Sequence, residues 1–369
     1  MNPYDFVRVE WQQPGVRRNA PPQDRFSGIS GRLEATITTL TPLFIPDKRS
    51  YNPGGNAPQQ FLCDQQGRAI IPGSSLKGLF RSLVETVGGG AWWFFGGKGV
   101  DGTWRDRTVQ GEMVDYSHQL PRDFKRPHSR EELDAACRMF GFLNSSQTLA
   151  GSVGCEDAIC AEPRFHDPIY TCILSTPKPR HRVWYLDDQQ RWVRGRKFYF
   201  HSTALQTVSG WLPHRDVFPK QRQNAYIQPI DAGSIFTFQV RFTSVTADDF
   251  ALLLYTLVLE PDMRHKLGYA KPAGLGSIEV QVNWIEIVDY MARYRAGGGG
   301  YTRYERGEGQ NDTLTPFVQA RIEPYTTNRS SVTLHDLRRI WQWPAVHEQR
   351  YPARDWFNQN PNTPLQDTP

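Results

Sequence analysis

Apolar and polar residues alternate along several segments of the chain. Four apolar residues alternate with polar ones in the segment 234–243, and the segment 278–284 shows the same period. A period of two residues places successive side chains on opposite faces of a sheet. A similar alternation covers 31–41, and 153–160 has the length and composition of a further short strand. The sequence therefore predicts four core strands.

Two other segments carry apolar residues at helical spacing. In 74–87 the apolar residues recur every three or four positions, and Gly88–Gly90 follow. In 246–258 the same spacing recurs, and Pro261 follows. Ser74 and Thr246 have the side chains that accept a hydrogen bond from a free N–H in the first helical turn. The pattern predicts a helix in each segment, with shorter helices at about 129–140 and 331–341.

The predicted elements follow the order strand, helix, strand, strand, helix, strand. This order is that of the split βαβ arrangement, so we expect an α+β, ferredoxin-like (RRM-like) βαββαβ core. The core would occupy residues 1–287, beginning with an irregular arm and carrying large irregular insertions at about 88–150 and 161–233. Residues 288–369 would form a C-terminal extension with a glycine run at 297–300.

Composition narrows the function only slightly. The 369 residues carry a net charge of +5, which permits an anionic partner but indicates one only if the charge is clustered. Aromatic residues make up 12% of the chain, which favours stacking surfaces or an extensive protein interface. No apolar run is long enough for a bilayer, no signal-peptide core opens the chain, and five cysteines are too few for a disulfide framework. We expect a cytoplasmic protein without a membrane partner.

The stretch IIPGSSLKGLFR, Ile70–Arg81, joins a strand end to the start of a helix. Ser74 and Ser75 stand at the helix start, and Lys77 and Arg81 lie one turn apart on one side. Free N–H groups and the helix dipole at such a start favour a phosphate. The alternative is an ordinary capped helix with solvated charges.

The stretch KLGYAKPAGLGSI, Lys266–Ile278, is a glycine-rich loop before a predicted strand. Its glycines permit positive φ angles and a close approach to a ligand, and its lysines supply charge. A nucleotide P-loop would precede a helix, so a polynucleotide backbone is the better ligand. The candidate contacts in this loop are Lys266, Gly268, Lys271, Gly274 and Gly276.

The segment 161–233 interleaves basic and aromatic residues, most densely in GRKFYFH, Gly195–His201. Such a mixture suits a nucleic-acid backbone and unstacked bases, and Arg196, Lys197 and His201 are the candidate contacts. The alternative is a solvated hairpin whose aromatic rings face the core.

Several of these stretches resemble motifs of one family. IPGSSLKGLFR resembles the helix-opening motif of the RAMP superfamily, the CRISPR-associated RNA-binding proteins that form the backbone of type III effector complexes. KLGYAKPAGLGSI resembles the glycine-rich loop before the last core strand of that family, and Met139–Ala158 resembles its stretch between the two. GRKFYFH is similar to a less well described RAMP branch. The three main blocks appear in family order and cover about a quarter of the chain.

The resemblance implies an RRM-like fold and a guide-RNA-binding backbone subunit of a ribonucleoprotein that serves antiviral defence. Ser74, Ser75, Lys77 and Arg81 would hold one stretch of RNA backbone, and the glycine-rich loop would hold another. The implied partners are guide RNA, complementary target RNA and other CRISPR effector subunits. Binding of this kind requires no cofactor.

The resemblance also raises a catalytic alternative. RAMP subunits that cut target RNA are similar in using an Asp between the first strand and this helix, but here the matching position falls near Asn56, which cannot act as a base. Asp47 is a possible substitute, and cleavage there would need Mg²⁺. A metal-independent guide-processing RNase using His201 and His265 is a further alternative, although no partner base is evident. No histidine pair has zinc-ligand spacing with cysteine.

Overall fold

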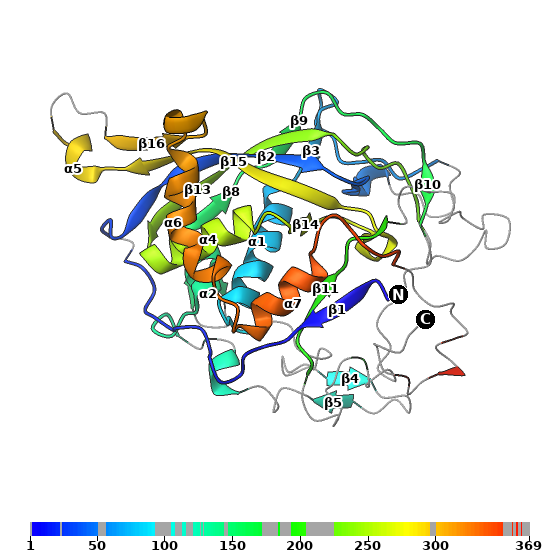
Figure 1. Ribbon diagram of the computed structural model, residues 1–369, viewed down its shortest axis with the longest axis horizontal. Coiled ribbons are helices and arrows are strands. Elements are labelled where there is room, and N and C mark those ends of the chain that lie inside the picture. The colour runs from blue at the N-terminus through cyan, green and yellow to red at the C-terminus, as the bar shows by residue number, and fades with distance from the viewer. Residues whose placement is uncertain are drawn as a thin grey trace.

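A curled antiparallel sheet covers a layer of helices in the computed structural model (Figure 1). The structure describes residues 2–22, 24–50, 57–92, 105–107, 113–115, 121–125, 127, 129–143, 147–171, 184, 193–203, 225–295, 300–349, 356, 359–360 and 363. In the main sheet the strands follow the order β14-β15-β2-β13-β9-β3, with β16 on β15 and β8 on β13. An α+β protein is therefore confirmed.

The strands of the main sheet are β2 (Ile29–Thr39), β3 (Ala69–Ile71), β8 (Val153–Cys155), β9 (Ala158–Cys160), β13 (Ile235–Val245), β14 (His265–Lys266), β15 (Ser277–Val288) and β16 (Tyr301–Glu305). Separate two-stranded ladders pair β1 (Tyr4–Val7) with β11 (Arg196–Tyr199), β4 (Arg105–Arg107) with β5 (Met113–Asp115), β6 (Phe142–Leu143) with β7 (Thr148–Leu149), and β10 (Ile169–Tyr170) with β12 (Tyr226–Ile227). The helices are α1 (Gly73–Val87), α2 (Ala135–Phe140), α4 (Ala247–Val258), α5 (Tyr290–Arg293), α6 (Leu314–Thr326) and α7 (Val332–Ile340).

The register of the three central strands places their apolar residues on one face. Ile37 of β2 pairs with Phe236 of β13 on one side and with Val280 of β15 on the other, and all three side chains are buried. Because the side-chain period of a strand is two, their polar neighbours Thr36 and Thr237 point to the opposite face. The alternation predicted for β2, β13 and β15 is confirmed.

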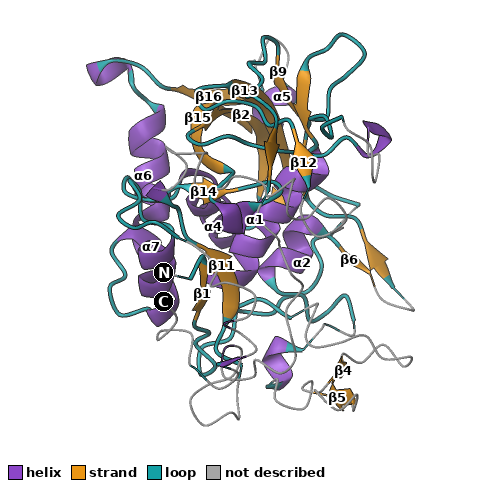
Figure 2. Cartoon of the chain, turned by 90° about the vertical axis from the view of Figure 1, so that its right-hand side faces the viewer, coloured by secondary structure: helices purple, strands orange, loops and turns teal. Residues whose placement is uncertain are grey.

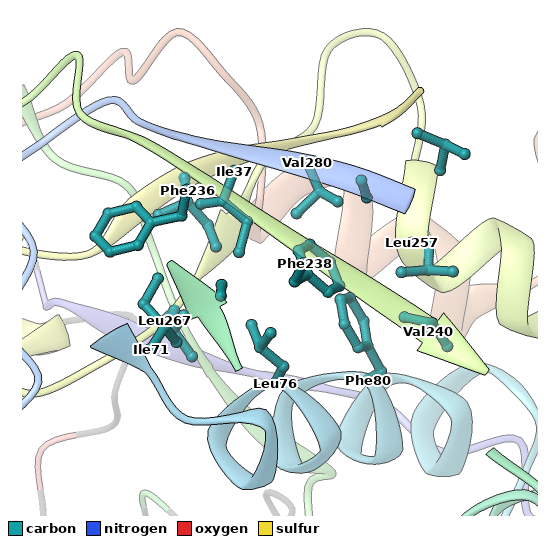
Figure 3. Close-up of a cluster of buried hydrophobic side chains, with 14 of the residues drawn as sticks. Ile37, Ile71, Leu76, Phe80, Phe236, Phe238, Val240, Leu257, Leu267 and Val280 are labelled. Atoms are coloured by element: carbon teal, nitrogen blue, oxygen red, sulfur yellow. The ribbon is translucent and has the colours of Figure 1, made fainter. Parts of the chain in front are cut away.

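Helix α1 packs beneath this apolar face (Figure 3). Leu76 and Phe80 are fully buried, and the ring of Phe80 stacks on Phe238 of the sheet with centroids 6.3 Å apart. Burial of a large apolar side chain contributes about 1.5–3 kcal/mol, so this face fixes the position of α1. Fixing α1 also fixes the side of the helix that faces away from the sheet.

The chain after the sheet packs back onto it. Strand β16 extends the sheet beside β15, and α6 lies against α4. The buried Glu260, which follows α4, accepts a 2.8 Å hydrogen bond from Arg338 of α7. Helix α7 also contacts β1 and α1, so two segments far apart in the sequence pack beside the helical layer (Figure 2).

Most predicted elements are found, with several corrections. The predicted strand 153–160 is divided into β8 and β9, and the short helix α2 starts at Ala135 with Asp134 as its cap rather than near 129. The expected irregular arm contains β1, because Tyr4 to Val7 pair with β11. The helix predicted at 331–341 is α7, and Thr246 caps α4 as expected. The division of the chain into a core and an extension at residue 288 stays a prediction.

Among the residues the structure describes, no helix has the length and apolarity that a membrane span requires. Cys137, Cys155 and Cys160 lie in α2, β8 and β9 as free cysteines, which fits their expected place in helix and strand.

Candidate nucleic-acid interface

A groove of about 520 Å³ lies between α1 and the glycine-rich loop. One side of α1, Ser75, Gly78, Leu79 and Ser82, forms one wall, and residues 266–269 with Lys271 form another. Residues 197–199 of β11 line the groove as well. Figure 2 shows β11 and β14 beside α1. Two sequence segments nearly 200 residues apart thus meet at one surface, together with a strand from the 161–233 stretch.

The glycines of the loop are needed for its path. Gly268 and Gly274 both have φ of +87°, and Gly276 has φ of +80°, as the sequence predicts. A Cβ on Gly276 would lie 1.8 Å from the carbonyl oxygen of Leu267, and one on Gly268 would lie 2.7 Å from that of Phe44. Of these glycines only Gly268 lines the groove. Gly274 and Gly276 therefore determine the backbone path of the loop without lining the groove.

Lys266 is buried and stabilises the glycine-rich loop through hydrogen bonds. Its ammonium group donates to the carbonyl oxygens of Gly274 at 2.8 Å and Leu275 at 3.0 Å. Only 4% of the residue is exposed, and burial holds the pKa of Lys266 well below its usual value. Its side chain supports the loop rather than offering an ammonium group to a ligand.

Two half-buried lysines flank one tyrosine ring in the groove. The Nζ atom of Lys197 lies 5.1 Å from the ring centroid of Tyr199, and that of Lys271 lies 5.8 Å from it. Lys197 also lies 3.6 Å from the ring of Tyr4, and Lys271 donates to the carbonyl oxygen of Gly268 at 2.9 Å. Burial lowers the pKa of Lys197 to about 8 and lowers that of Lys271 as well. An anion in the groove would offset the cost of desolvating these ammonium groups.

Sequence reasoning included Tyr199 among the aromatic residues interleaved with basic ones in 161–233, but it named neither Tyr199 nor Tyr269 as a contact. Tyr199 and Tyr269 both line the groove, and Tyr269 is 37% exposed. The signal was present, since each tyrosine stands two residues from a lysine, Lys197 or Lys271, that is itself a candidate contact. The groove thus combines ammonium groups with rings on which bases stack, as sites for single-stranded nucleic acid do.

The start of α1 differs from the expectation. Pro72 is the N-cap, and no side chain caps the helix locally, so the assignment of Ser74 as cap is wrong. The carboxylate of Asp157 instead accepts a 2.7 Å hydrogen bond from the N–H of Gly73. Because Asp157 stands 84 residues away, spacing along the sequence gave no sign of it. A carboxylate already occupies the first N–H that was expected to face a phosphate.

Lys77 and Arg81 lie on another side of α1 from the groove. At 100° per residue both are separated from Ser75 by more than a quarter turn, and neither lines the groove. Arg81 donates to Glu85 at 2.8 Å and to the carbonyl oxygen of Gly141 at 3.1 Å. Burial raises the pKa of Cys155 to about 12, and the nearby ammonium group of Lys77 partly offsets this. The structure therefore separates these two cations from the glycine-rich loop.

The remaining candidates of GRKFYFH are held by the protein itself. Arg196 donates to the carbonyl oxygens of Gly90 at 2.8 Å and Ala91 at 3.1 Å, and burial lowers its pKa. His201 is 3% exposed, and its ring nitrogens lie 2.8 Å from Ser277 Oγ and 3.0 Å from the carbonyl oxygen of Arg264. Burial lowers the pKa of His201 well below its usual value. Both side chains connect this segment to the core.

The catalytic candidates Asp47, His201 and His265 are not among the residues that line the groove, although Asp47 directly follows the lining residue Pro46. Asp47 pairs with Arg49, whose guanidinium lies 2.9 Å from the carboxylate and lowers the pKa of Asp47. His265 is buried and its Nε2 lies 2.8 Å from the carbonyl oxygen of Thr256. Asn56 lies outside the described residues. Within the described ranges no three His, Cys, Asp or Glu side chains gather as a metal site would require.

A match to a family model identifies the family of the chain. The model of the RAMP superfamily matches residues 36–279, which include the end of β2, all of α1, β13 and α4, and the glycine-rich loop. The chain belongs to the RAMP superfamily. Membership in this superfamily implies a CRISPR-associated, RNA-binding role. No curated protein matches the chain.

The groove of this RAMP protein lies mostly within the residues that the family model matches. Both α1 and the loop 266–276 fall within the matched residues, and so does β11. The β1 strand that pairs with β11 lies outside them. The groove is therefore a surface of the family core, closed on one side by a strand ladder that the N-terminal residues complete.

Proposed function

We propose that this RAMP protein is a guide-RNA-binding backbone subunit of a type III CRISPR ribonucleoprotein. It would act in the cytoplasm and pair with other effector subunits around the guide RNA and its complementary target. The observation that carries the proposal is the groove in which Lys197, Lys271 and Tyr199 meet one side of α1.

The strand order supports a ferredoxin-like core. The four core strands in chain order are β2, β9, β13 and β15. Across the sheet they lie in the order β15, β2, β13, β9, that is, fourth, first, third, second. Helix α1 connects the first to the second strand, and α4 connects the third to the fourth. All neighbouring pairs are antiparallel, as this split βαβ arrangement requires. We infer the RRM-like core on this ground.

Charge and geometry in the groove favour the RNA backbone over a nucleotide cofactor. The glycine-rich loop leads into β15 rather than into a helix, so it does not offer a row of helix N–H groups to a di- or triphosphate. Gly78 on α1 has no neighbour within 4 Å of where its Cβ would lie, which leaves room for a strand to approach the helix. Contacts of this kind are independent of base sequence.

We assign different roles to the sequence candidates. Ser75, Lys197, Gly268 and Lys271 line the groove and would contact the backbone, with Tyr199 and Tyr269 beneath the bases. Lys266, Gly274 and Gly276 would shape the loop. For Ser74 and Lys77, which do not line the groove, an RNA contact remains a prediction of its own.

Crosslinking tests the proposal directly. The purified complex would be assembled on a guide carrying 4-thiouridine, irradiated and digested, and the crosslinked peptides would be identified by mass spectrometry. We expect crosslinks in the peptides that contain Tyr199 and Tyr269. Crosslinks confined to other peptides, or a complex that purifies without RNA, would exclude the groove as the guide-binding surface.

A further inference from the structure

A second pocket, of about 720 Å³, lies at the opposite end of the main sheet from the groove. It is formed where β2 begins and β13 and β15 end, and α5 and the start of β16 complete its rim. Strand β15 starts next to the glycine-rich loop and reaches this pocket at Glu286, nine residues later. At about 3.3 Å per residue the two sites are roughly 30 Å apart. In Figure 1, α5 and β16 extend from the sheet on the side away from the N-terminus.

The rim of this pocket carries an exposed pair of aromatic rings. Phe26 and Tyr290 stack with centroids 4.3 Å apart and planes at 18°. Phe26 is nevertheless 59% exposed, so the outer face of its ring is open to solvent. Tyr301 across the rim is 55% exposed. A flat ring with one face covered and one open is the geometry on which an unstacked base adds a further layer.

Paired charges lie on one side of the pocket. Arg32 and Arg303 lie 5.5 and 4.3 Å from the ring centroid of Trp284, and both bind the buried carboxylate of Glu286, at 2.6 and 2.9 Å. Arg32 lines the pocket beside Glu286, the one acidic side chain among its described lining residues. Arg303 and Trp284 lie outside the lining, and Arg303 also pairs with Glu305. The two arginines balance the charge of Glu286, so this carboxylate does not repel an anion in the pocket.

The rim adds two more cations. Arg241 pairs with Glu156 at 2.6 Å, but both side chains are largely exposed, so this pair is readily exchanged for another anion. Arg293 is exposed and has no acidic partner among the described residues. The pocket therefore presents open aromatic faces beside guanidinium groups. An acidic peptide would use the charges but leave the Phe26 ring face open, whereas a nucleotide uses both.

We propose that this pocket binds an unpaired nucleotide of single-stranded RNA, with its base on Phe26 and its phosphate at Arg293. The inference rests on the RNA-binding role proposed above and adds a second contact on the same chain.

The test uses the full-length chain and a 20-nucleotide oligouridylate, which is long enough for both sites and forms no stable duplex. Fluorescence anisotropy would give Kd for the wild type, Phe26→Ala, Phe26→Trp and Arg293→Ala. We expect Kd to rise about five- to hundredfold for Phe26→Ala, since base stacking contributes on that scale. Phe26→Trp should restore it, because indole offers a larger ring face.

The matched controls are Phe165→Ala and Arg122→Ala, an exposed ring and an exposed cation outside both sites, which should bind as the wild type does. For an oligonucleotide of the same length that carries no bases, Phe26→Ala and the wild type should have the same Kd. Wild-type affinity of Phe26→Ala for oligouridylate would overturn the inference, and so would an equal loss on the abasic strand. If instead Phe26→Ala keeps RNA but loses a protein subunit from the purified complex, the pocket is a protein interface and the inference fails.

The outcome is separable from that of the proposed function. Lys197→Ala with Lys271→Ala weakens binding only if the groove holds RNA. Normal binding by that double variant would refute the groove, while normal binding by Phe26→Ala beside a weakened groove variant would refute the second site alone.

Discussion

The ammonium group of Lys266 donates a 2.8 Å hydrogen bond to the carbonyl oxygen of Gly274 from a buried position. The same group donates to Leu275, so one side chain satisfies two carbonyl groups of the glycine-rich loop. The sequence alone predicts that Lys266 contacts a ligand, whereas these hydrogen bonds indicate that Lys266 stabilises the loop.

Lys266→Met should lower the free energy of unfolding by about 1–3 kcal/mol, because the carbonyl groups of Gly274 and Leu275 both lose a donor and, among the described residues, only that of Gly274 keeps another, the hydroxyl of Thr41. Thermal denaturation measures the effect. Lys271→Met is the matched control: it removes a single bond, to Gly268, from a half-buried lysine and should shift Tm less. Equal Tm values for the Lys266 variant and the wild type would show that these two hydrogen bonds do not stabilise the folded chain.

Asp157 should stabilise α1 from outside the helix. Asp157→Ala leaves the N–H of Gly73 without its acceptor and should cost about 1 kcal/mol of stability, while Asp157→Asn should retain most of it. Ser74→Ala provides the comparison, since Ser74 caps nothing. Urea denaturation of the three variants decides the point. A larger loss for Ser74→Ala than for Asp157→Ala would restore the sequence-based assignment.

RNA affinity should depend on pH through Lys197. Because burial lowers the pKa of Lys197 to about 8, its positive charge is present at pH 7 and mostly absent at pH 9. We therefore expect Kd for single-stranded RNA to rise between these pH values. Lys197→Arg should flatten the profile, since arginine stays charged throughout.

The same shift has a consequence for stability, with the opposite sign. A lysine whose pKa is lower in the folded chain than its usual 10.5 is bound to fewer protons there than in the unfolded chain. Stability should therefore rise with pH between about 8 and 10.5, and this contribution should disappear in Lys197→Met. A pH profile of RNA binding or of stability that Lys197 substitutions leave unchanged would contradict the assigned pKa.

Asp47→Ala should leave target-RNA cleavage by the assembled complex unchanged in the presence of Mg²⁺. The carboxylate of Asp47 is held by Arg49, which competes with a cation for the same oxygens. Product analysis on denaturing gels measures the rate. Loss of cleavage in Asp47→Ala, with the complex still assembled, would make this residue the catalytic one and overturn the prediction.

Periodicity predicted the parts of the fold whose pattern is local. Residues around Phe236 and Phe238 alternate, and those around Leu76 and Phe80 have helical spacing. Each pattern depends only on which face is buried, so the strand β13 and the helix α1 were predicted correctly. Strand β1 was missed because Tyr4–Val7 is too short to show a period and pairs with residues nearly 200 positions away.

The candidate groove contains the predicted glycine-rich loop, but not all of the residues that were predicted together with it. Glycine content located the loop, since positive φ angles leave a direct mark on the sequence. Burial leaves no such mark on a lysine or arginine. Lys266 and Lys271 look alike in sequence and both line the groove, yet Lys266 is buried and Lys271 is only half-buried. Spacing on α1 correctly placed Lys77 and Arg81 together, but only the packing of the helix shows that they face away from the loop.

The salt dependence of RNA binding tests the central claim most directly. Removal of one cation that neutralises a phosphate of single-stranded RNA should reduce the slope of log K against log salt concentration by about 0.7. For Lys197→Ala with Lys271→Ala we predict weaker binding and a slope smaller by about 1.4, while the control Arg122→Ala with Arg329→Ala, two exposed arginines outside the groove, keeps the wild-type slope. An unchanged slope in the lysine double variant would contradict the account, because the groove would then hold no RNA backbone.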